Sequence, residues 1–169
     1  MSKPSTDYTL EKMPTPLSSA LTEEIIQFWA SEGALQGEAA RQRVGEVYLA
    51  ARHKHTGAIV GVCTIKPLFI ESMGLFFYAF RCFVAQSHRS FEVLRQLFLA
   101  TYDDLNGAYT PHAKRSQPSQ PVGLFADIEN TLLQQRKGAV WADARNLTFI
   151  GLKPNGNHIR IAYFEGAQI

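Results

Sequence analysis

Two carboxylates, Asp127 and Glu129, are separated by one residue in an apolar segment and are the clearest candidates for acid–base chemistry. Side chains two apart on a β-strand point to the same face, so a strand here would bring both carboxylates to one surface. Glu129 is the first candidate for a general base because it falls at the carboxyl end of the predicted strand, where α/β folds open their clefts. The alternative is that both carboxylates pair with arginines of neighbouring strands.

Arg81 is a lone charge in the most apolar stretch of the chain, Leu75–Val84 (LFFYAFRCFV). Burying this charge without a partner would be costly. Two predictions therefore stay open. Arg81 either pairs with Asp127 or Glu129, or it binds an anionic group of a substrate, to which its planar guanidinium is suited.

The cysteines and the histidine pair of the central region indicate no reactive centre. Cys63 and Cys82 each lie in an apolar run, which is typical of a buried and unreactive thiol. His53 and His55 lie in a predicted turn, and nothing near them in sequence supplies the third and fourth ligands that zinc requires. The sequence predicts neither a nucleophilic cysteine nor a metal site.

The elements that would position these residues follow from hydrophobic periodicity. Residues 1–16 are polar and proline-rich, a tail with one possible edge strand, and residues 17–169 form a single domain. Helical spacing begins at Leu17, with Thr15 and Pro16 as cap and first-turn proline. The order of elements predicts a mixed α/β, or α+β, domain. The further helices are expected at 36–44, from Ser87 to about 105, and at 130–137, and the strands at 8–12, 46–53, 58–66, 75–84, 122–129, 147–153 and 158–164.

Composition narrows the class of protein. The chain has 169 residues, of which 46% are hydrophobic and 19% charged, with a formal net charge of +2. A chain of this size buries roughly 70% of its unfolded surface, which excludes extensive disorder. The small net charge argues against a nucleic-acid partner. No apolar run reaches the roughly 18 residues of a membrane span, and no secretion signal is evident, so we expect a cytoplasmic protein without a membrane partner.

The segment that begins at Val84 (VAQSHRSFEVL), taken with the order of elements, resembles the GNAT superfamily of acyl-CoA-dependent N-acyltransferases. In that family the loop after the central strand has the form Val-x-Pro-x-x-Arg-Gly-x-Gly-x-Gly/Ala. Its backbone amides hold the pyrophosphate of coenzyme A at the start of a helix. Val84 and Arg89 match this pattern, whereas Ser90, Glu92 and Leu94 stand where glycine, or glycine or alanine, is usual.

The resemblance covers residues 8–164 and implies a mostly antiparallel central sheet flanked by helices, with acetyl-CoA or another acyl-CoA as co-substrate and no metal. In the family an asparagine, matched here by Asn130, commonly follows the fifth strand, and a tyrosine seven or eight residues later often protonates the leaving thiolate. In this chain Lys137 and Gly138 occupy the region of that tyrosine. Tyr163 would take this role only if the terminal hairpin brings it to the site. The residues implied to bind the cofactor are Val84, His88, Arg89, Ser90, Phe91, Glu92, Val93 and Asn130.

Two functions follow from these expectations. The first is transfer of an acetyl or longer acyl group from coenzyme A to a small-molecule amine or a peptide by direct attack. Glu129 and Tyr163 would then be catalytic, and Arg81 and Asp127 would bind substrate. The second is a catalytically degenerate ligand-binding or regulatory module on the same fold, consistent with the missing glycines and the absent tyrosine. The apolar C-terminal hairpin makes a homodimer possible.

Overall fold

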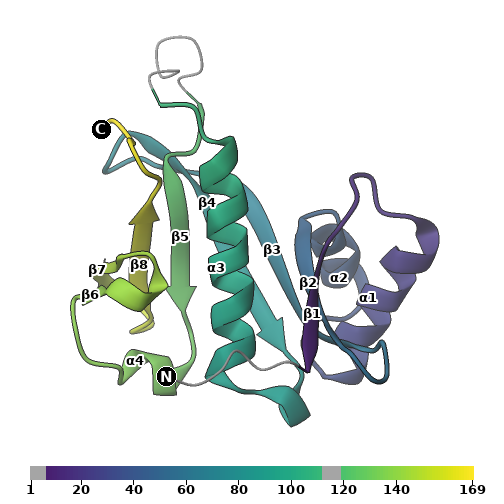
Figure 1. Ribbon diagram of the computed structural model, residues 1–169. Coiled ribbons are helices and arrows are strands. Elements are labelled where there is room, and N and C mark those ends of the chain that lie inside the picture. The colour runs from purple at the N-terminus through teal and green to yellow at the C-terminus, as the bar shows by residue number, and fades with distance from the viewer. Residues whose placement is uncertain (1–6, 112–118) are drawn as a thin grey trace. The chain divides into compact units, whose positions relative to one another are not determined.

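The structure is a computed structural model that describes residues 7–111 and 119–169. Its eight strands are hydrogen-bonded in the order β1-β2-β3-β4-β5-β8-β7-β6. The pairing of β4 with β5 is parallel, and the pairs β1–β2, β2–β3, β5–β8, β7–β8 and β6–β7 are antiparallel. The elements (Figure 1) are β1 (Tyr8–Lys12), α1 (Ser19–Ser31), α2 (Gly37–Val44), β2 (Val47–His53), β3 (Ile59–Ile70), β4 (Leu75–Val84), η1 (Gln86–His88), α3 (Phe91–Ala108), β5 (Gly123–Ile128), α4 (Thr131–Gln134), β6 (Val140–Trp141), η3 (Ala142–Ala144), β7 (Leu147–Leu152) and β8 (His158–Tyr163).

Two compact units divide the chain. Unit 1 contains the residues up to Ile65 together with Cys82–Thr101, and unit 2 contains Lys66–Arg81 together with Tyr102–Ile169. Strands β3 and β4 and helix α3 therefore each contribute residues to both units. Each unit has its own apolar cluster.

The core of unit 1 joins α1 and α2 to strands β2 and β3. Helix α1 begins after Ser18, whose Oγ accepts a hydrogen bond from the N–H of Leu21 at 3.2 Å. The prediction of Thr15 as the cap is wrong, because the cis Thr15–Pro16 peptide lies ahead of the helix and the Ser18 side chain satisfies a first-turn amide. The fully or nearly fully buried apolar residues of this core include Ile25, Phe28, Trp29, Ala40, Val44, Val47, Ala50, Ile59 and Val62.

Helix α3 approaches β3 closely in unit 1. A side chain at Gly61 would place its Cβ 3.1 Å from Leu97 Cδ1, which is tighter than ordinary packing. The Cys63 Sγ lies 3.3 Å from the hydroxyl of Thr101, itself fully buried on α3. Glycine at 61 therefore allows the helix to pack at this distance.

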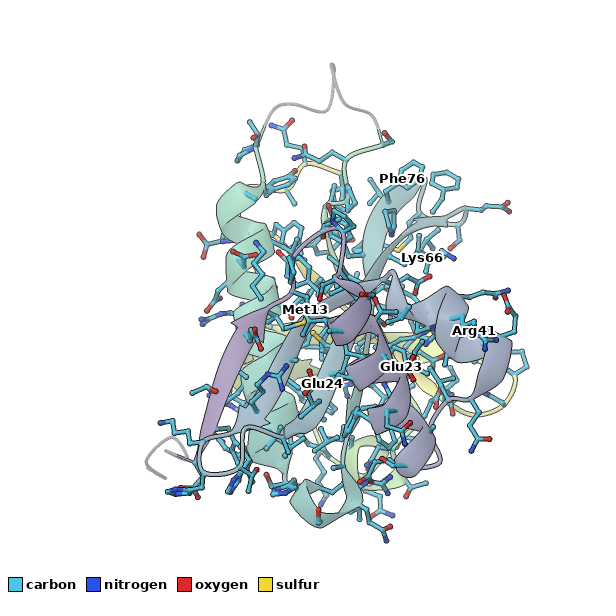
Figure 2. All side chains as sticks on the ribbon, turned by 90° about the vertical axis from the view of Figure 1, so that its right-hand side faces the viewer. Met13, Glu23, Glu24, Arg41, Lys66 and Phe76 are labelled. Carbon is cyan, nitrogen blue, oxygen red and sulfur yellow. The ribbon has the colours of Figure 1, made fainter. Side chains whose placement is uncertain are left out.

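Arg52 of β2 joins three segments of unit 1. Its Nε donates to Glu11 of β1 at 2.6 Å, and its two terminal nitrogens donate to the Glu24 carboxylate of α1 at 2.6 and 2.9 Å. It also donates to the carbonyl of Gly57 at 2.9 Å. Figure 2 labels Glu24 on its helix. These bonds raise the pKa of Arg52 and lower that of Glu24, so the ion pair keeps both groups charged.

The core of unit 2 is built on β4, β5 and β8. Leu75, Phe77 and Ile161 are buried together with Val122. Gly123 pairs with Tyr163 at the start of β5, and any Cβ there would collide with the carbonyl oxygen of Ala162. Glycine is required at this position because the two backbones meet without room for a side chain.

Arg160 of β8 fastens the segment that follows α4. Its side chain donates to the carbonyls of Gly138, Ala139 and Leu147 at 3.0, 3.1 and 3.2 Å, and its guanidinium carbon lies 3.6 Å from the ring centroid of Trp141. Arg160 is only 3% exposed. The residues that the structure describes give it no carboxylate partner. Burial, and secondarily the charge of Arg136, lowers its pKa.

The predicted elements agree closely with the observed ones, with a few informative differences. Strand β3 continues to Ile70, the helix after β5 has only four residues, and the two-residue strand β6 was not predicted. Helix α3 begins at Phe91 rather than Ser87, because η1 occupies Gln86–His88. No helix in the described ranges combines the length and apolar character needed to cross a bilayer.

Candidate functional site

The sequence predicts that the loop between β4 and α3 binds the pyrophosphate of the cofactor. Several backbone amides of this loop already donate hydrogen bonds to acceptors within the protein. The N–H of Gln86 donates to the Glu32 carboxylate at 2.8 Å, and that of Ser90 donates to the carbonyl of His88 at 2.7 Å. The Ser90 Oγ accepts from the N–H of Val93 at 3.4 Å and so caps α3. Of the four amides from Ser90 to Val93 predicted to hold pyrophosphate, the first and last thus have internal acceptors.

The cationic side chains of this loop remain at the surface. Arg89 is exposed, with its Nε 3.4 Å from the carbonyl of Val84 and its guanidinium 5.6 Å from the Phe83 ring centroid. The His88 Nδ1 lies 3.0 Å from the hydroxyl of Tyr8. When Tyr8 donates in this bond, the other ring nitrogen of His88 carries the proton and is a donor. His88 and Arg89 are therefore the groups able to bind a phosphate here.

Glu92 does not point its charge at the loop in the way that the sequence suggests. Its Oε1 accepts a hydrogen bond from the Gln96 side chain at 2.9 Å, one turn further along α3. Phe91, at the start of the helix, is 46% exposed, whereas Val93 is buried. The carboxylate thus lies along the helix surface, in the first turn where the helix dipole favours a negative charge.

The carboxyl end of β5, in unit 2, holds the predicted carboxylates, and they differ. The Asp127 carboxylate accepts from Lys153 Nζ at 2.6 Å and from Asn157 Nδ2 at 2.9 Å. Both of its oxygens are engaged by the β7–β8 hairpin, so neither a substrate-binding role nor pairing with an arginine is supported for it. Glu129 is exposed directly after the strand, and no hydrogen bond or ion pair to its side chain occurs among the described residues. Of the two predicted carboxylates, Glu129 is therefore the one without a hydrogen-bonded partner in the described part of the chain.

Asn130 caps a helix instead of presenting its oxygen to a ligand. Its Oδ1 accepts from the amides of Leu132 and Leu133 at 2.9 and 3.1 Å, as the N-cap of α4. The Oδ1 of Asn130 is thus engaged within the protein, and cofactor binding by Asn130 stays a prediction. The carbonyl of Ile128 accepts from the Gln134 side chain at 2.8 Å.

Tyr163 is at the wrong end of β5 for catalysis beside Glu129. It pairs with Gly123, the first residue of β5, and so lies about 17 Å along the strand from Ile128 at the usual rise. Its ring packs 5.6 Å from that of Phe77, and burial raises its pKa. The terminal hairpin does not bring Tyr163 to the predicted site, and the assignment as general acid is a correction that the strand register imposes.

His158 is the titratable residue that the sequence reasoning missed. It pairs with Ile128, so β8 brings an imidazole to the carboxyl end of β5. Its ring meets that of Phe149 edge to face, with the centroids 5.3 Å apart, and its buried Nδ1 has no hydrogen-bond partner among the described atoms. Strand β8 was predicted, but its pairing with β5, which cannot be deduced from one sequence, is what places His158 here.

Arg81 forms no ion pair with Asp127 or Glu129 in the described part of the chain, and substrate binding by Arg81 stays a prediction. Arg81 is exposed on β4, so it needs no buried partner, and Asp127 pairs with Lys153 instead. Cys63 is buried, and burial raises its pKa to about 11 and that of Cys82 well above its ordinary value. Neither thiol is a nucleophile near neutral pH. In residues 7–111 and 119–169 no three His, Cys, Asp or Glu side chains are grouped as metal ligands require.

Comparisons with known proteins identify the fold. No family model matches the chain, and no curated protein is significantly similar to it. Among solved structures, a bacterial toxin superposes with a TM-score of 0.60 at 10% identity, covering 94% of this chain and 91% of the toxin. The GNAT family N-acetyltransferase YhbS from Escherichia coli, in complex with CoA, gives 0.57 at 15% identity, covering 97% and 85%.

A third structure extends the likeness to a protein-modifying enzyme. The ribosomal-protein-S5-alanine acetyltransferase from Vibrio fischeri gives a TM-score of 0.57 at 10% identity, covering 96% of both chains. The likeness spans nearly the whole chain in every case, and it agrees with the mixed sheet, its parallel β4–β5 pair and the helix that follows β4. The chain has a GNAT-like fold.

Proposed function

We propose that the protein is an acyl-CoA-dependent N-acyltransferase that transfers an acetyl or longer acyl group to an amine. The observation that carries this proposal is the likeness of nearly the whole fold to an N-acetyltransferase that binds CoA. The parallel β4–β5 pair and the α3 helix after β4 are the elements that the sequence resemblance associates with this chemistry. The acceptor is a small-molecule amine or a peptide.

Glu129 is proposed as the base. An acceptor amine is protonated near neutral pH and must lose a proton before its nitrogen can attack a thioester carbonyl. The exposed Glu129 carboxylate, without an internal partner, can take this proton directly or through water. Acyl-CoA supplies the activated thioester, and the sulfur leaves with the electrons of the broken C–S bond.

His88 and Arg89 are proposed to bind the phosphates of the co-substrate. Two of the four predicted loop amides already have acceptors inside the protein, so the side chains provide most of the interaction. A charge-assisted hydrogen bond from Arg89 to phosphate is stronger than a neutral one. The carboxylate of Glu32 already accepts from the amide of Gln86, and an incoming phosphate would have to displace it to use that donor.

The engaged amides also favour a second candidate function. A GNAT-fold module that binds a ligand, or regulates a partner, without transferring an acyl group would not need an open pyrophosphate loop. The N–H of Val93 donates to Ser90 Oγ, the N–H of Ser90 donates to the carbonyl of His88, and Tyr163 is far from Glu129, as such a degenerate site would allow.

Calorimetric titration with CoA and acetyl-CoA tests the binding step. We expect Arg89→Ala to weaken binding at least tenfold, because a phosphate loses its guanidinium partner. The control is Arg41→Ala, which removes a similarly charged side chain that is 70% exposed on α2 (Figure 2). No binding to the parent protein at millimolar CoA, or an equal loss in both variants, would overturn the assignment of this loop.

Thiol release from acetyl-CoA with a panel of amines tests the chemistry. Glu129→Gln should lower kcat by about 10²-fold or more and leave the Kd for CoA unchanged, since general bases contribute on that scale. Binding of CoA by the parent protein without thiol release for any amine would select the binding module.

A further inference from the structure

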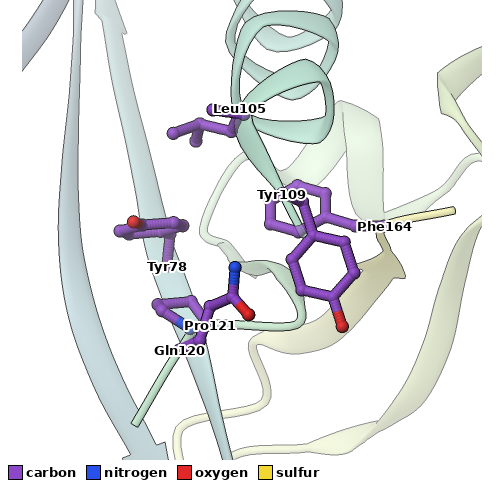
Figure 3. Close-up of a pocket in the computed structure, with 7 residues that line it drawn as sticks. Tyr78, Leu105, Tyr109, Gln120, Pro121 and Phe164 are labelled. Carbon is purple, nitrogen blue, oxygen red and sulfur yellow. The ribbon is translucent and has the colours of Figure 1, made fainter. Parts of the chain in front are cut away.

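A small cavity lies at the carboxyl end of α3 and the amino end of β5. Its volume is about 50 Å³. Pro121 on its wall precedes β5, whereas Glu129 follows that strand, so the cavity is separate from the proposed catalytic end. We refer to it as the aromatic pocket, and the side chains drawn around it in Figure 3 include Tyr78, Leu105, Tyr109, Gln120, Pro121 and Phe164.

Three aromatic rings form most of the wall. Phe164 is 3% exposed, and its ring centroid lies 5.5 Å from that of Tyr109 and 6.5 Å from that of Tyr78. Figure 3 shows Tyr78 on one side of the space and Tyr109 with Phe164 on the other. A ring on β4, a ring directly after α3 and a ring directly after β8 thus lie around one small volume.

Hydrogen bonds hold this wall in place before any ligand binds. The N–H of Phe164 donates to the carbonyl of Val122 at 2.8 Å, and that of Glu165 donates to the Asn106 side chain at 2.7 Å. The hydroxyl of Tyr102 donates to the carbonyl of Tyr163 at 2.6 Å. A pocket fixed in this way loses little ordering entropy on binding.

The carbonyl end of helix α3 lies beside the pocket. Helix α3 ends at Ala108, and the carbonyl end of a helix carries a partial negative charge. The last turn of α3 contains no basic residue, and no lysine or arginine is among the described residues that line the pocket. Near this helix end, burial raises the pKa of Tyr102, the carboxylates of Glu165 and Asp103 add to the rise, and the cation of Arg145 opposes it. The Gln120 carboxamide can direct its oxygen to a cation.

We propose that the aromatic pocket binds a methylated ammonium group. The negative faces of aromatic rings attract cations within about 6 Å, and rings grouped as a cage are the usual receptor for quaternary ammonium groups. The volume corresponds to roughly four water-sized spheres, a size that suits one such head group and excludes larger ring systems. Choline-like small molecules and methylated lysine side chains share this chemistry. The proposal is independent of acyl transfer.

Saturation-transfer NMR and calorimetry on the full chain test it, with choline as the probe. We expect the choline methyl protons to receive saturation and its neutral isostere, 3,3-dimethylbutan-1-ol, to bind at least tenfold more weakly. A short trimethyllysine peptide and its unmethylated form distinguish a peptide source from a free small molecule. Equal binding of choline and the neutral isostere, or no binding of either at millimolar concentration, would overturn the proposal.

Two pairs of variants localise the site. Gln120 is half-buried at the wall, so Gln120→Lys and Gln120→Glu should both fold. Lysine should weaken choline binding at least tenfold, and glutamate should strengthen it. Tyr109→Leu should lose binding that Tyr109→Phe keeps, with Phe69→Leu as the control, since Phe69 is an exposed aromatic residue outside the pocket. Lysine and glutamate variants that bind choline alike would place the cation elsewhere.

Discussion

Arg52 in unit 1 and Arg160 in unit 2 are both arginines with little exposure to solvent, but their hydrogen-bond partners differ in kind. Both guanidiniums are largely removed from water, and both join segments distant in sequence. Arg52 meets two carboxylates, which raise its pKa, whereas Arg160 meets three carbonyls and an indole, and burial lowers its pKa. The comparison separates two contributions that are often combined, namely charge neutralisation and the satisfaction of backbone acceptors.

Replacing Arg160 should have the largest effect on stability. Arg160→Met leaves the carbonyls of Gly138, Ala139 and Leu147 without these donors in a buried place, and unsatisfied buried acceptors are costly. We expect a loss of about 3 kcal/mol in the free energy of unfolding, measured with urea. The control is Arg145→Met, because Arg145 is 46% exposed and its pair with Asp103 is worth less than about 1 kcal/mol. Equal losses of unfolding free energy in the two variants would show that the carbonyl contacts of Arg160 stabilise the protein no more than an exposed ion pair does.

Replacing Arg52 should cost less and should depend on pH. Arg52→Met releases Glu11 and Glu24, whose side chains are 45% and 42% exposed and can be solvated, so we expect a loss of about 1 to 2 kcal/mol. The pKa of Glu24 is lowered below its ordinary value of 4.5, so the stability from this pair is present above 4.5 and is lost as pH falls through the lowered pKa. The difference between parent and variant should therefore shrink below pH 4.5. A difference that stays constant in urea titrations from neutral to acidic pH would contradict the ion-pair account.

Salt should produce the smallest effect and the sharpest contrast. At about 1 M NaCl the Debye length is near 3 Å, and exposed ion pairs are screened. The cost of Arg52→Met should decrease by about 0.5 kcal/mol, while the cost of Arg160→Met should not change, because its carbonyl partners carry no net charge. A similar salt dependence for both variants would remove the distinction between the two arginines.

Much of the fold could be predicted from local pattern, but the site could not. Strand β4 has the predicted bounds, because its apolar run is long, follows the turn at residues 71–74 and is followed within two residues by the polar Gln86. The pattern does not tell which face of that strand meets solvent, and so Arg81 is exposed where burial was expected. Likewise Asn130 follows β5 as predicted, but whether an asparagine caps the next helix or meets a ligand depends on a helix start that the sequence leaves ambiguous.

Long-range pairing was the second limit. The wrong role of Tyr163 and the missed His158 have one cause, the register of β5 against β8, which joins residues more than 25 positions apart. The hydrogen bonds of Arg160 to three carbonyls could not be predicted for the same reason. An arginine in a short strand has no local sign that three carbonyls from another segment will surround it.

The position of β8 between β5 and β7 makes the protein prone to aggregate when the chain is cut before β8. The strand that completes one edge of β5 comes about 30 residues later in the chain, after α4, β6 and β7. Any nicked or truncated product that lacks residues after 157 would leave β5 with an open, apolar edge, and unpaired edges of this kind recruit other chains. Limited proteolysis near the β7–β8 turn should therefore yield insoluble material in place of a stable shorter domain.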